Sequence, residues 1–147
     1  MFKNILIPTD GTPVSQKAIE AGVKFAKVHG AKVTGLFAAP SATPVVYENF
    51  LPVGYTTPAK HAKMIEKTAN QYLAVIEMAA KKAGLRCEVV HLTSDFPAET
   101  IIDMARKKRC DCIFMASHSR KGIVGVLLGS QTQKVVANAT VPVLVYR

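Results

Sequence analysis

Residues Asp111 to Asn138 read DCIFMASHSRKGIVGVLLGSQTQKVVAN, and the predicted architecture rests on them. An apolar run suited to a buried strand comes first, followed by a polar, basic turn from Ser117 to Lys121. A loop with three glycines then leads into a helix that begins at Ser130. Backbone N–H groups at a helix start are unpaired, and the helix dipole places partial positive charge there. This order of strand, loop and helix therefore favours a site that holds an anion.

Outward from this stretch, short apolar runs alternate with segments whose apolar residues recur at helical spacing. We expect strands at Phe2–Pro8, Lys32–Ala39, Arg86–Leu92, Asp111–Ala116 and Val141–Tyr146. We expect helices from Thr12–Pro13 to Gly30, then at Ala59–Ala83, Pro97–Lys108 and Ser130–Asn138. The alternation predicts an α/β fold, a doubly wound five-stranded parallel sheet with helices on both faces.

Local signals refine some of these elements. Gly35 lies inside a strand, which suggests close approach by a neighbouring element. Ser130 can cap the last helix, and Gln133 three residues later would complete a capping box. In the first helix, the residues expected to face the core are Val14, Ala18, Ala21, Phe25 and Val28.

The chain length indicates one domain spanning residues 1–147, and the apolar fraction of 49% is ample for a packed core. No apolar run approaches transmembrane length and no signal peptide is evident, so a cytoplasmic location is expected. Cys87, Cys110 and Cys112 show no metal-knuckle or redox spacing and are expected to be buried or half-buried free thiols.

The formal net charge is +9, which raises the question of a nucleic-acid partner. The basic residues are scattered over several segments, and the one compact run, Arg106 to Arg109, lies at the expected end of a helix. Cations there offset the negative end of the helix dipole. No aromatic stacking motif accompanies the run, so we expect a solvated basic surface and no nucleic-acid partner.

Residues 40–58 form the least regular part of the chain, with four prolines and three aromatic residues. A connection of this length is uncommon unless it is functional or mobile. It is either a surface loop packed by its own aromatic side chains or a flap over a site, and the sequence leaves both open.

Polar residues follow two of the expected strands. Pro8, Thr9 and Asp10 end the first strand, and Ser117, His118 and Ser119 follow the fourth. In parallel sheets, ligands bind outside the carboxyl ends of the strands, where the strand order reverses. If the first and fourth strands are neighbours, both ends line one crevice. The pattern there is neither a P-loop nor the dinucleotide fingerprint.

These residues resemble the universal stress protein family over the whole chain. The opening ILIPTDGT, the helix start from Pro97-Ala98 to Ile101, the loop ASHSRKGIVGVLLGS and the closing VPVLVY match its layout. ATP-binding members carry a glycine, two residues, a second glycine, nine residues and then Gly-Ser or Gly-Thr. Gly129-Ser130 keeps the final pair, whereas Ala116 and Ser119 replace the first two glycines. The resemblance implies a Rossmann-like, adenine nucleotide alpha hydrolase-like fold that binds ATP, ADP or AMP.

The resemblance also implies the site residues. Ala38 would flank the base. Pro8, Thr9 and Asp10 would contact the ligand on its adenine side and on the side near the metal ion. The ribose and phosphates would contact Met115, Ala116, His118 and Ser119. The phosphates would be held by Gly129, Ser130, Gln131 and Thr132. Asp10 is the carboxylate placed to share a Mg²⁺ ion with phosphate oxygens. The family further implies a homodimer that pairs through the last strand.

No general base faces the expected γ-phosphate position and no arginine finger is identifiable, so we expect a regulatory binding protein with slow or absent hydrolysis. Two alternatives remain. The replacements at Ala116 and Ser119 favour a nucleotide-independent interaction module of the same fold. A hydrolase using Ser117, His118 and Asp10 is the other, although no nucleophile-elbow sequence is present.

Overall fold

The computed structural model describes residues 1–41, 46–48, 51–53, 57–118 and 128–147. Its elements in chain order are β1 (Asn4–Pro8), α1 (Pro13–His29), β2 (Lys32–Ala39), β3 (Val46–Glu48), β4 (Leu51–Val53), α2 (Pro58–Ala83), β5 (Cys87–Thr93), α3 (Pro97–Lys107), β6 (Cys112–Ala116), α4 (Ser130–Asn138) and β7 (Val143–Tyr146). Within these residues, every helix is too short or too polar to cross a membrane.

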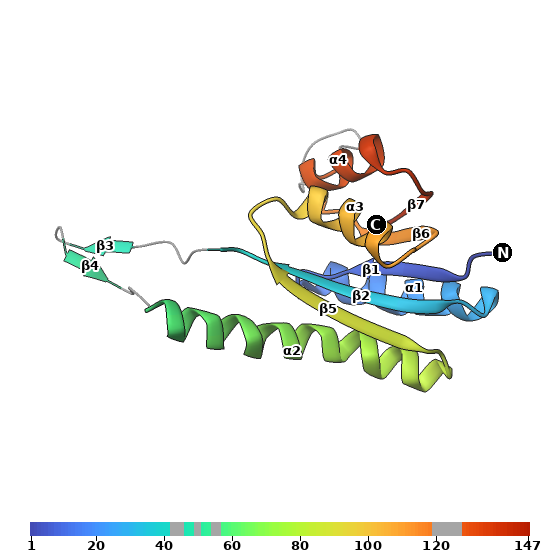
Figure 1. Ribbon diagram of the computed structural model, residues 1–147, viewed down its shortest axis with the longest axis horizontal. Helices are drawn as coiled ribbons and strands as arrows, with labels where there is room; N and C mark the ends of the chain where they lie inside the picture. The colour runs from blue at the N-terminus through green and yellow to red at the C-terminus, as the bar shows by residue number, and fades with distance from the viewer. Residues whose placement is uncertain (42–45, 49–50, 54–56, 119–127) are drawn as a thin grey trace.

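The main sheet has the strand order β5-β2-β1-β6-β7, and all its neighbouring strands are parallel. Helices α1 and α2 cover one face, while α3 and α4 cover the other (Figure 1). The doubly wound five-stranded sheet predicted from the alternation of strands and helices is therefore confirmed. The strand order reverses between β1 and β6, which run side by side.

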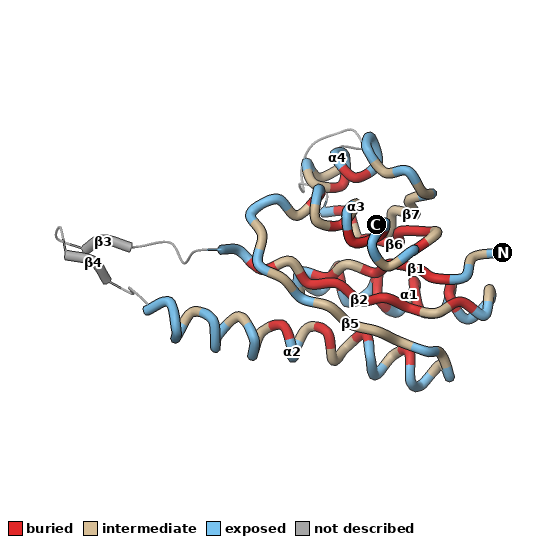
Figure 2. Tube along the Cα trace, in the orientation of Figure 1, coloured by how far each residue is buried: buried red, intermediate tan, exposed pale blue. Residues whose placement is uncertain are grey.

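A cluster of buried apolar side chains lies on each side of the sheet. Figure 2 marks the buried positions along the chain. Strands β1 and β6 are buried on both faces, as expected for central parallel strands, and Ile5, Leu6 and Ile113 are fully inaccessible to solvent. The close approach expected at Gly35 is also present, because a Cβ added there would lie 2.9 Å from Cδ1 of Ile76. That distance is too short for any larger residue, so Gly35 lets α2 rest against β2.

The buried face of α1 matches the predicted one in part, since Ala18 is buried and Ala21 and Phe25 pack against the core. Ile19 and Val23 are buried, whereas Val28, predicted to face the core, is 82% exposed. The face is displaced because Gly22 lies at the contact with the sheet, where an added Cβ would be 2.9 Å from Ile7 and 3.0 Å from Phe114. Phe25 lies at the edge of this contact and packs against aromatic rings.

Within residues 40–58, β3 and β4 form a two-stranded antiparallel pair. The pair lies beyond the start of α2, away from the main sheet (Figure 1). The remaining residues between 42 and 56 lie outside the described part of the chain, so the alternatives of a loop and a flap both stand as sequence-based hypotheses.

Candidate functional site

The carboxyl ends of β1, β2 and β6 surround a cavity of about 220 Å³. Because β1 and β6 are neighbours, Thr9 and Asp10 after β1 and His118 after β6 reach the same cavity, as the sequence predicted on that condition. Ser117, also predicted at this strand end, is not among the lining residues. The starts of α3 and α4 complete its wall. Its lining residues are Pro8, Thr9, Asp10, Ser15, Leu36, Ala38, Pro97, Ile101, Met115, Ala116, His118, Gln131 and Thr132.

The turn after β1 is held by a network of hydroxyl groups. Ser15 donates from Oγ to Thr9 Oγ1 over 3.0 Å, and Gly11 donates its N–H to the same Thr9 oxygen over 3.2 Å. Thr12 caps α1, since its Oγ1 accepts the N–H of Ser15. The N-cap predicted at Thr12 is therefore confirmed, and this network fixes the direction in which Asp10 leaves the strand.

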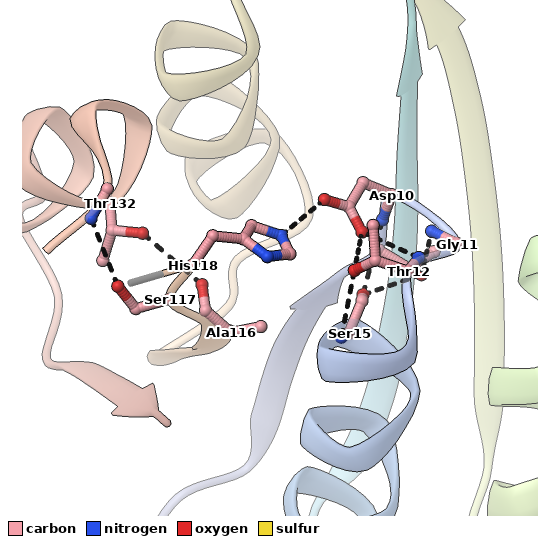
Figure 3. Close-up of polar contacts among 10 residues, drawn as sticks. Asp10, Gly11, Thr12, Ser15, Ala116, Ser117, His118 and Thr132 are labelled. Atoms are coloured by element: carbon pink, nitrogen blue, oxygen red, sulfur yellow. Dashed lines mark hydrogen bonds and ion pairs between the residues drawn. The ribbon is translucent and has the colours of Figure 1, made fainter. Parts of the chain in front are cut away.

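Asp10 and His118 meet at the cavity, although they are far apart in the sequence. Asp10 Oδ1 accepts both the N–H and the Oγ1–H of Thr12, at 3.0 and 2.6 Å. Its other oxygen, Oδ2, lies 2.7 Å from Nε2 of His118 (Figure 3). Partial burial acts to raise the pKa of Asp10, but the hydrogen bonds from Thr12 and the contact with His118 outweigh it. The pKa of Asp10 is thus lowered from 3.8.

The start of α4 is tied to the end of β6. Gly129 donates its N–H to Oγ of Ser117 over 3.3 Å, and Thr132 Oγ1 donates to the carbonyl of Ala116 over 3.4 Å. An added Cβ on Gly129 would lie 3.1 Å from the His118 carbonyl oxygen. These contacts hold the amino-terminal turn of α4, with its unpaired N–H groups, beside the cavity.

The capping box predicted for this helix is wrong. Gly129 is the N-cap residue, Ser130 is already helical, and no side chain caps the helix. Gln133 Nε2 instead donates to the carbonyl of Leu128 over 2.6 Å. Because Gly129 occupies the cap position, Ser130 forms the first residue of the turn that faces the candidate site.

Most of the predicted site residues gather in one place. Nine of them line the cavity: Pro8, Thr9, Asp10, Ala38, Met115, Ala116, His118, Gln131 and Thr132. Gly129 and Ser130 lie at the start of α4, next to the lining residues Gln131 and Thr132. Ser119, with the glycine-rich loop that follows it, lies outside the described residues.

Four lining residues were not predicted: Ser15, Leu36, Pro97 and Ile101. The hydroxyl of Ser15, three positions after the cap residue Thr12, was a detectable signal for the first of these. Pro97 and Ile101 come from α3, whose start is held to α4 by the hydrogen bond from the Ala98 N–H to Oε1 of Gln131, 3.3 Å long. No local pattern shows which helix start will close a cavity, since that depends on packing.

The side chains at the cavity fit a metal ion only if a bound ligand supplies further oxygen atoms to it. Among the described residues, no group of three or more His, Cys, Asp or Glu side chains is placed to hold an ion. Asp10 is a single carboxylate, and Mg²⁺ commonly takes one or two carboxylates with waters and substrate phosphates. The residues therefore fit Mg²⁺ shared with a phosphate group, with Asp10 as the protein ligand.

The fold and this strand-end cavity define a doubly wound α/β protein with a cavity where its strand order reverses. The model of the universal stress protein family matches residues 1–147, so the chain belongs to that family. It is 30% identical over 147 residues to a universal stress protein of Thermus aquaticus, with all of both chains covered. It is 28% identical over 152 residues to one of Methanocaldococcus jannaschii, covering 100% of this chain and 83% of the relative.

Solved structures of universal stress proteins share the fold. One in complex with cAMP has a TM-score of 0.70 at 18% identity, over 99% of this chain and 97% of the other. Another, from Archaeoglobus fulgidus in complex with dAMP, has a TM-score of 0.66 at 17% identity, over 99% of this chain and 98% of the other. Both neighbours therefore bind adenine nucleotides on the same architecture.

Proposed function

We propose that this universal stress protein binds an adenine nucleotide in the strand-end cavity and acts as a regulatory stress-response protein. The observation that carries the proposal is the position of the cavity. It lies where the strand order reverses between β1 and β6, with the amino-terminal turn of α4 beside it. The adenine nucleotides of the two structural neighbours support the ligand class.

ATP with Mg²⁺ is the form that suits this site best in our proposal. The apolar part of the cavity, with Leu36, Ala38 and Ile101, would hold the base. The first N–H groups of α4 would bind phosphate oxygens. Asp10 would share the metal ion with those oxygens through Oδ2, the oxygen that contacts His118.

Regulation rather than catalysis is supported by the ionisable groups at the site. Among the residues that the structure describes, which leave out Arg120 and Lys121, the titratable side chains that line the cavity are Asp10 and His118, and they are paired with each other. Neither is an arginine or lysine able to stabilise a transferring phosphoryl group. We expect no ADP release above the buffer blank from saturating Mg-ATP, and turnover abolished by His118→Ala would refute this part of the proposal.

Calorimetric titration with Mg-ATP, AMP and cAMP tests the binding. We expect saturable heat with at least one of the three ligands and a matching rise in melting temperature. Absence of both heat and thermal shift at millimolar nucleotide would remove the proposal. Mass spectrometry of small molecules released on denaturation offers an independent test, because a tightly held nucleotide co-purifies.

A second candidate is an interaction module of the same fold that works without nucleotide. It is favoured by Ala116, which lines the cavity at a position where the ATP-binding pattern has glycine. Gly129→Val separates the two candidates, because an added Cβ is already 3.1 Å from the His118 carbonyl and a branched side chain would displace α4. Function in the cell should fail with this variant only if nucleotide is needed.

We also propose a homodimer in the cytoplasm. Strand β7 is at the edge of the sheet, and its Leu144 is 39% exposed. An uncovered apolar edge strand tends to pair with another strand, so a second copy of β7 is the proposed partner. A monomeric mass by light scattering at micromolar concentration would contradict it.

A further inference from the structure

More than half of the 19 lysines and arginines lie at the end of the molecule opposite the cavity. In a parallel sheet with helical crossovers, the strand starts and helix ends share one edge, on the right of Figure 1. We call this surface the basic end. Its residues are Lys3, Lys27, Lys32, Lys81, Lys82, Arg86, Arg106, Lys107, Lys108 and Arg109.

Backbone hydrogen bonds show that these residues are neighbours. Lys32 donates its N–H to the carbonyl of Lys3, and Val33 donates to the carbonyl of Arg86, both over 2.9 Å. The starts of β1, β2 and β5 therefore stand in a row. Asn4 Nδ2 donates to the carbonyl of Lys108 over 2.9 Å, which brings the end of α3 to the same row. The basic end is thus one band across the sheet edge.

Most carboxylates at this end already form ion pairs or accept hydrogen bonds. Glu88 pairs with both Lys32 and Lys108, and Asp103 pairs with Arg106. Asp111 accepts the backbone N–H groups of Lys3 and Asn4. Glu77, one turn before Lys81, is a further acid nearby. In the described part of the chain, the exposed cations of the band with no carboxylate within 4.0 Å are Lys3, Lys27, Lys81, Lys82, Arg86, Lys107 and Arg109.

Helix dipoles explain only some of these charges. Lys27, Lys81, Lys82, Arg106 and Lys107 stand in the last turns of helices, where cations are favourable. Lys3, Lys32, Arg86 and Arg109 belong to no helix. The sequence suggested scattered cations, but the parallel topology collects them on one surface. A concentrated positive field of this kind attracts polyanions.

We propose that the basic end binds the phosphate backbone of duplex nucleic acid without reading its sequence. The strand starts that carry Lys3, Lys32 and Arg86 stand in a row, which suits a duplex backbone. Arg86 and Arg109 have no carboxylate partner among the described residues, and each can bind a phosphate through two N–H groups. Single-stranded partners are bound largely by stacking on aromatic rings. The aromatic rings described at this end, Phe2, Phe25 and His29, are half-buried and pack on one another, with the centroids of Phe2 and Phe25 5.6 Å apart.

An anionic membrane is the competing partner for such a charge. Stable docking on lipid combines basic residues with an apolar face that enters the bilayer. The exposed large apolar side chains near this end are Met1, Val28 and Met78, of which Met1 precedes β1, Val28 lies on α1 and Met78 on α2. They form no common helix face, so the observations favour nucleic acid.

A matched pair of triple variants tests the proposal in the full chain. Lys81→Ala/Lys82→Ala/Arg86→Ala removes three exposed cations from the basic end. Lys60→Ala/Lys63→Ala/Lys67→Ala removes three exposed cations from the first half of α2, far from it. Both lower the net charge from +9 by the same amount. Circular dichroism melting checks that each remains folded.

Binding is measured by fluorescence anisotropy with a fluorescein-labelled 20-base-pair mixed-sequence DNA duplex between 50 and 200 mM KCl. We expect the natural chain to lose about 10³-fold in affinity across that range. The basic-end variant should bind at least about tenfold more weakly at 50 mM, and the slope of log affinity against log salt should shrink by about 3. The control variant should stay within about twofold of the natural chain.

Three results would overturn the proposal. The natural chain could fail to bind the duplex at 50 mM KCl. The control variant could lose as much affinity as the basic-end variant, which would make the effect one of net charge alone. Phosphatidylserine vesicles or a 20-nucleotide single strand could bind more tightly than the duplex, which would assign the surface to another partner. None of these results bears on nucleotide binding in the cavity.

Discussion

Nε2 of His118 lies 2.7 Å from Oδ2 of Asp10, and this contact joins the end of β6 to the turn after β1. Both side chains are about half exposed, and both line the cavity. Since Thr12 donates two hydrogen bonds to the other carboxylate oxygen, Oδ2 is the oxygen left for a metal ion, beside the imidazole ring. A mutation of Asp10 should therefore distinguish nucleotide binding that needs a metal ion from nucleotide binding that does not.

Asp10→Asn should weaken Mg-ATP binding by about tenfold or more, because an amide lacks the charge that attracts Mg²⁺. AMP measured with EDTA should change by less than about threefold, since it needs no metal ion at this position. Isothermal titration calorimetry provides both affinities. Equal losses for the two ligands would show that Asp10 contacts the nucleotide itself.

Ala116→Gly should raise the affinity for adenine nucleotide while lowering stability. Ala116 lines the cavity, and glycine restores the residue of the ATP-binding pattern. Glycine within a strand costs about 0.5–1 kcal/mol relative to alanine. Calorimetric titration and urea unfolding measure the two opposite effects, and an unchanged affinity would show that the methyl group does not crowd the ligand.

Local chemistry explains why the element boundaries could be predicted. Strand β2 and helix α4 have the predicted bounds, and α1 and α2 end at Gly30 and Gly84 in left-handed conformations with φ of +61° and +74°. Glycine adopts such a conformation without steric cost, so its position marks the helix end. Failures begin where a residue's role depends on its neighbours in space, as with Val28.

For the candidate site too, individual residues could be predicted from the sequence, whereas their contacts in space could not. The polar strand ends at Asp10 and His118 could be found from the sequence, because each directly follows an apolar run. Their mutual contact depends on β1 lying next to β6, which no local signal shows. The basic end is the extreme case, since cations from several separate segments become one surface only through the topology.

Gly11→Ala should destabilise the protein by at least about 3 kcal/mol. Gly11 has φ of +77°, and a Cβ there would lie 2.2 Å from the ring of Tyr72. The ring cannot easily move, because it packs against Phe37 with centroids 5.2 Å apart. Both steric overlap and backbone strain therefore act at this position. Urea unfolding gives the free energy.

Gly30→Ala is the matched control for that variant. Gly30 has φ of +61°, but an added Cβ would meet nothing within 4 Å. Its cost should be that of backbone strain alone, about 1–2 kcal/mol. Equal destabilisation by the two substitutions would contradict the role assigned to Tyr72.

Glu88→Gln should destabilise the protein at neutral pH by about 1 kcal/mol, and the effect should disappear in acid. Hydrogen bonds from Lys108 and then Lys32 lower the pKa of Glu88 from 4.5 to about 2. A carboxylate with a lowered folded-state pKa stabilises the protein above its unfolded-state pKa. That contribution is lost as the pH falls from about 4.5 through about 2. The expected energy is small because the side chain is 35% exposed and water screens the pairs.

Urea unfolding of the natural chain and the Glu88→Gln variant between pH 7 and pH 2 measures this difference. The two free energies of unfolding should converge across that window. Lys32→Met serves as the comparison, because it removes one partner and leaves the pair of Glu88 with Lys108 in place. The difference in unfolding free energy between the natural chain and Lys32→Met should also shrink as the pH falls, but by less than the difference for Glu88→Gln. A difference between the natural chain and Glu88→Gln that stays constant down to pH 2 would mean that the carboxylate charge contributes nothing to the stability of the sheet edge.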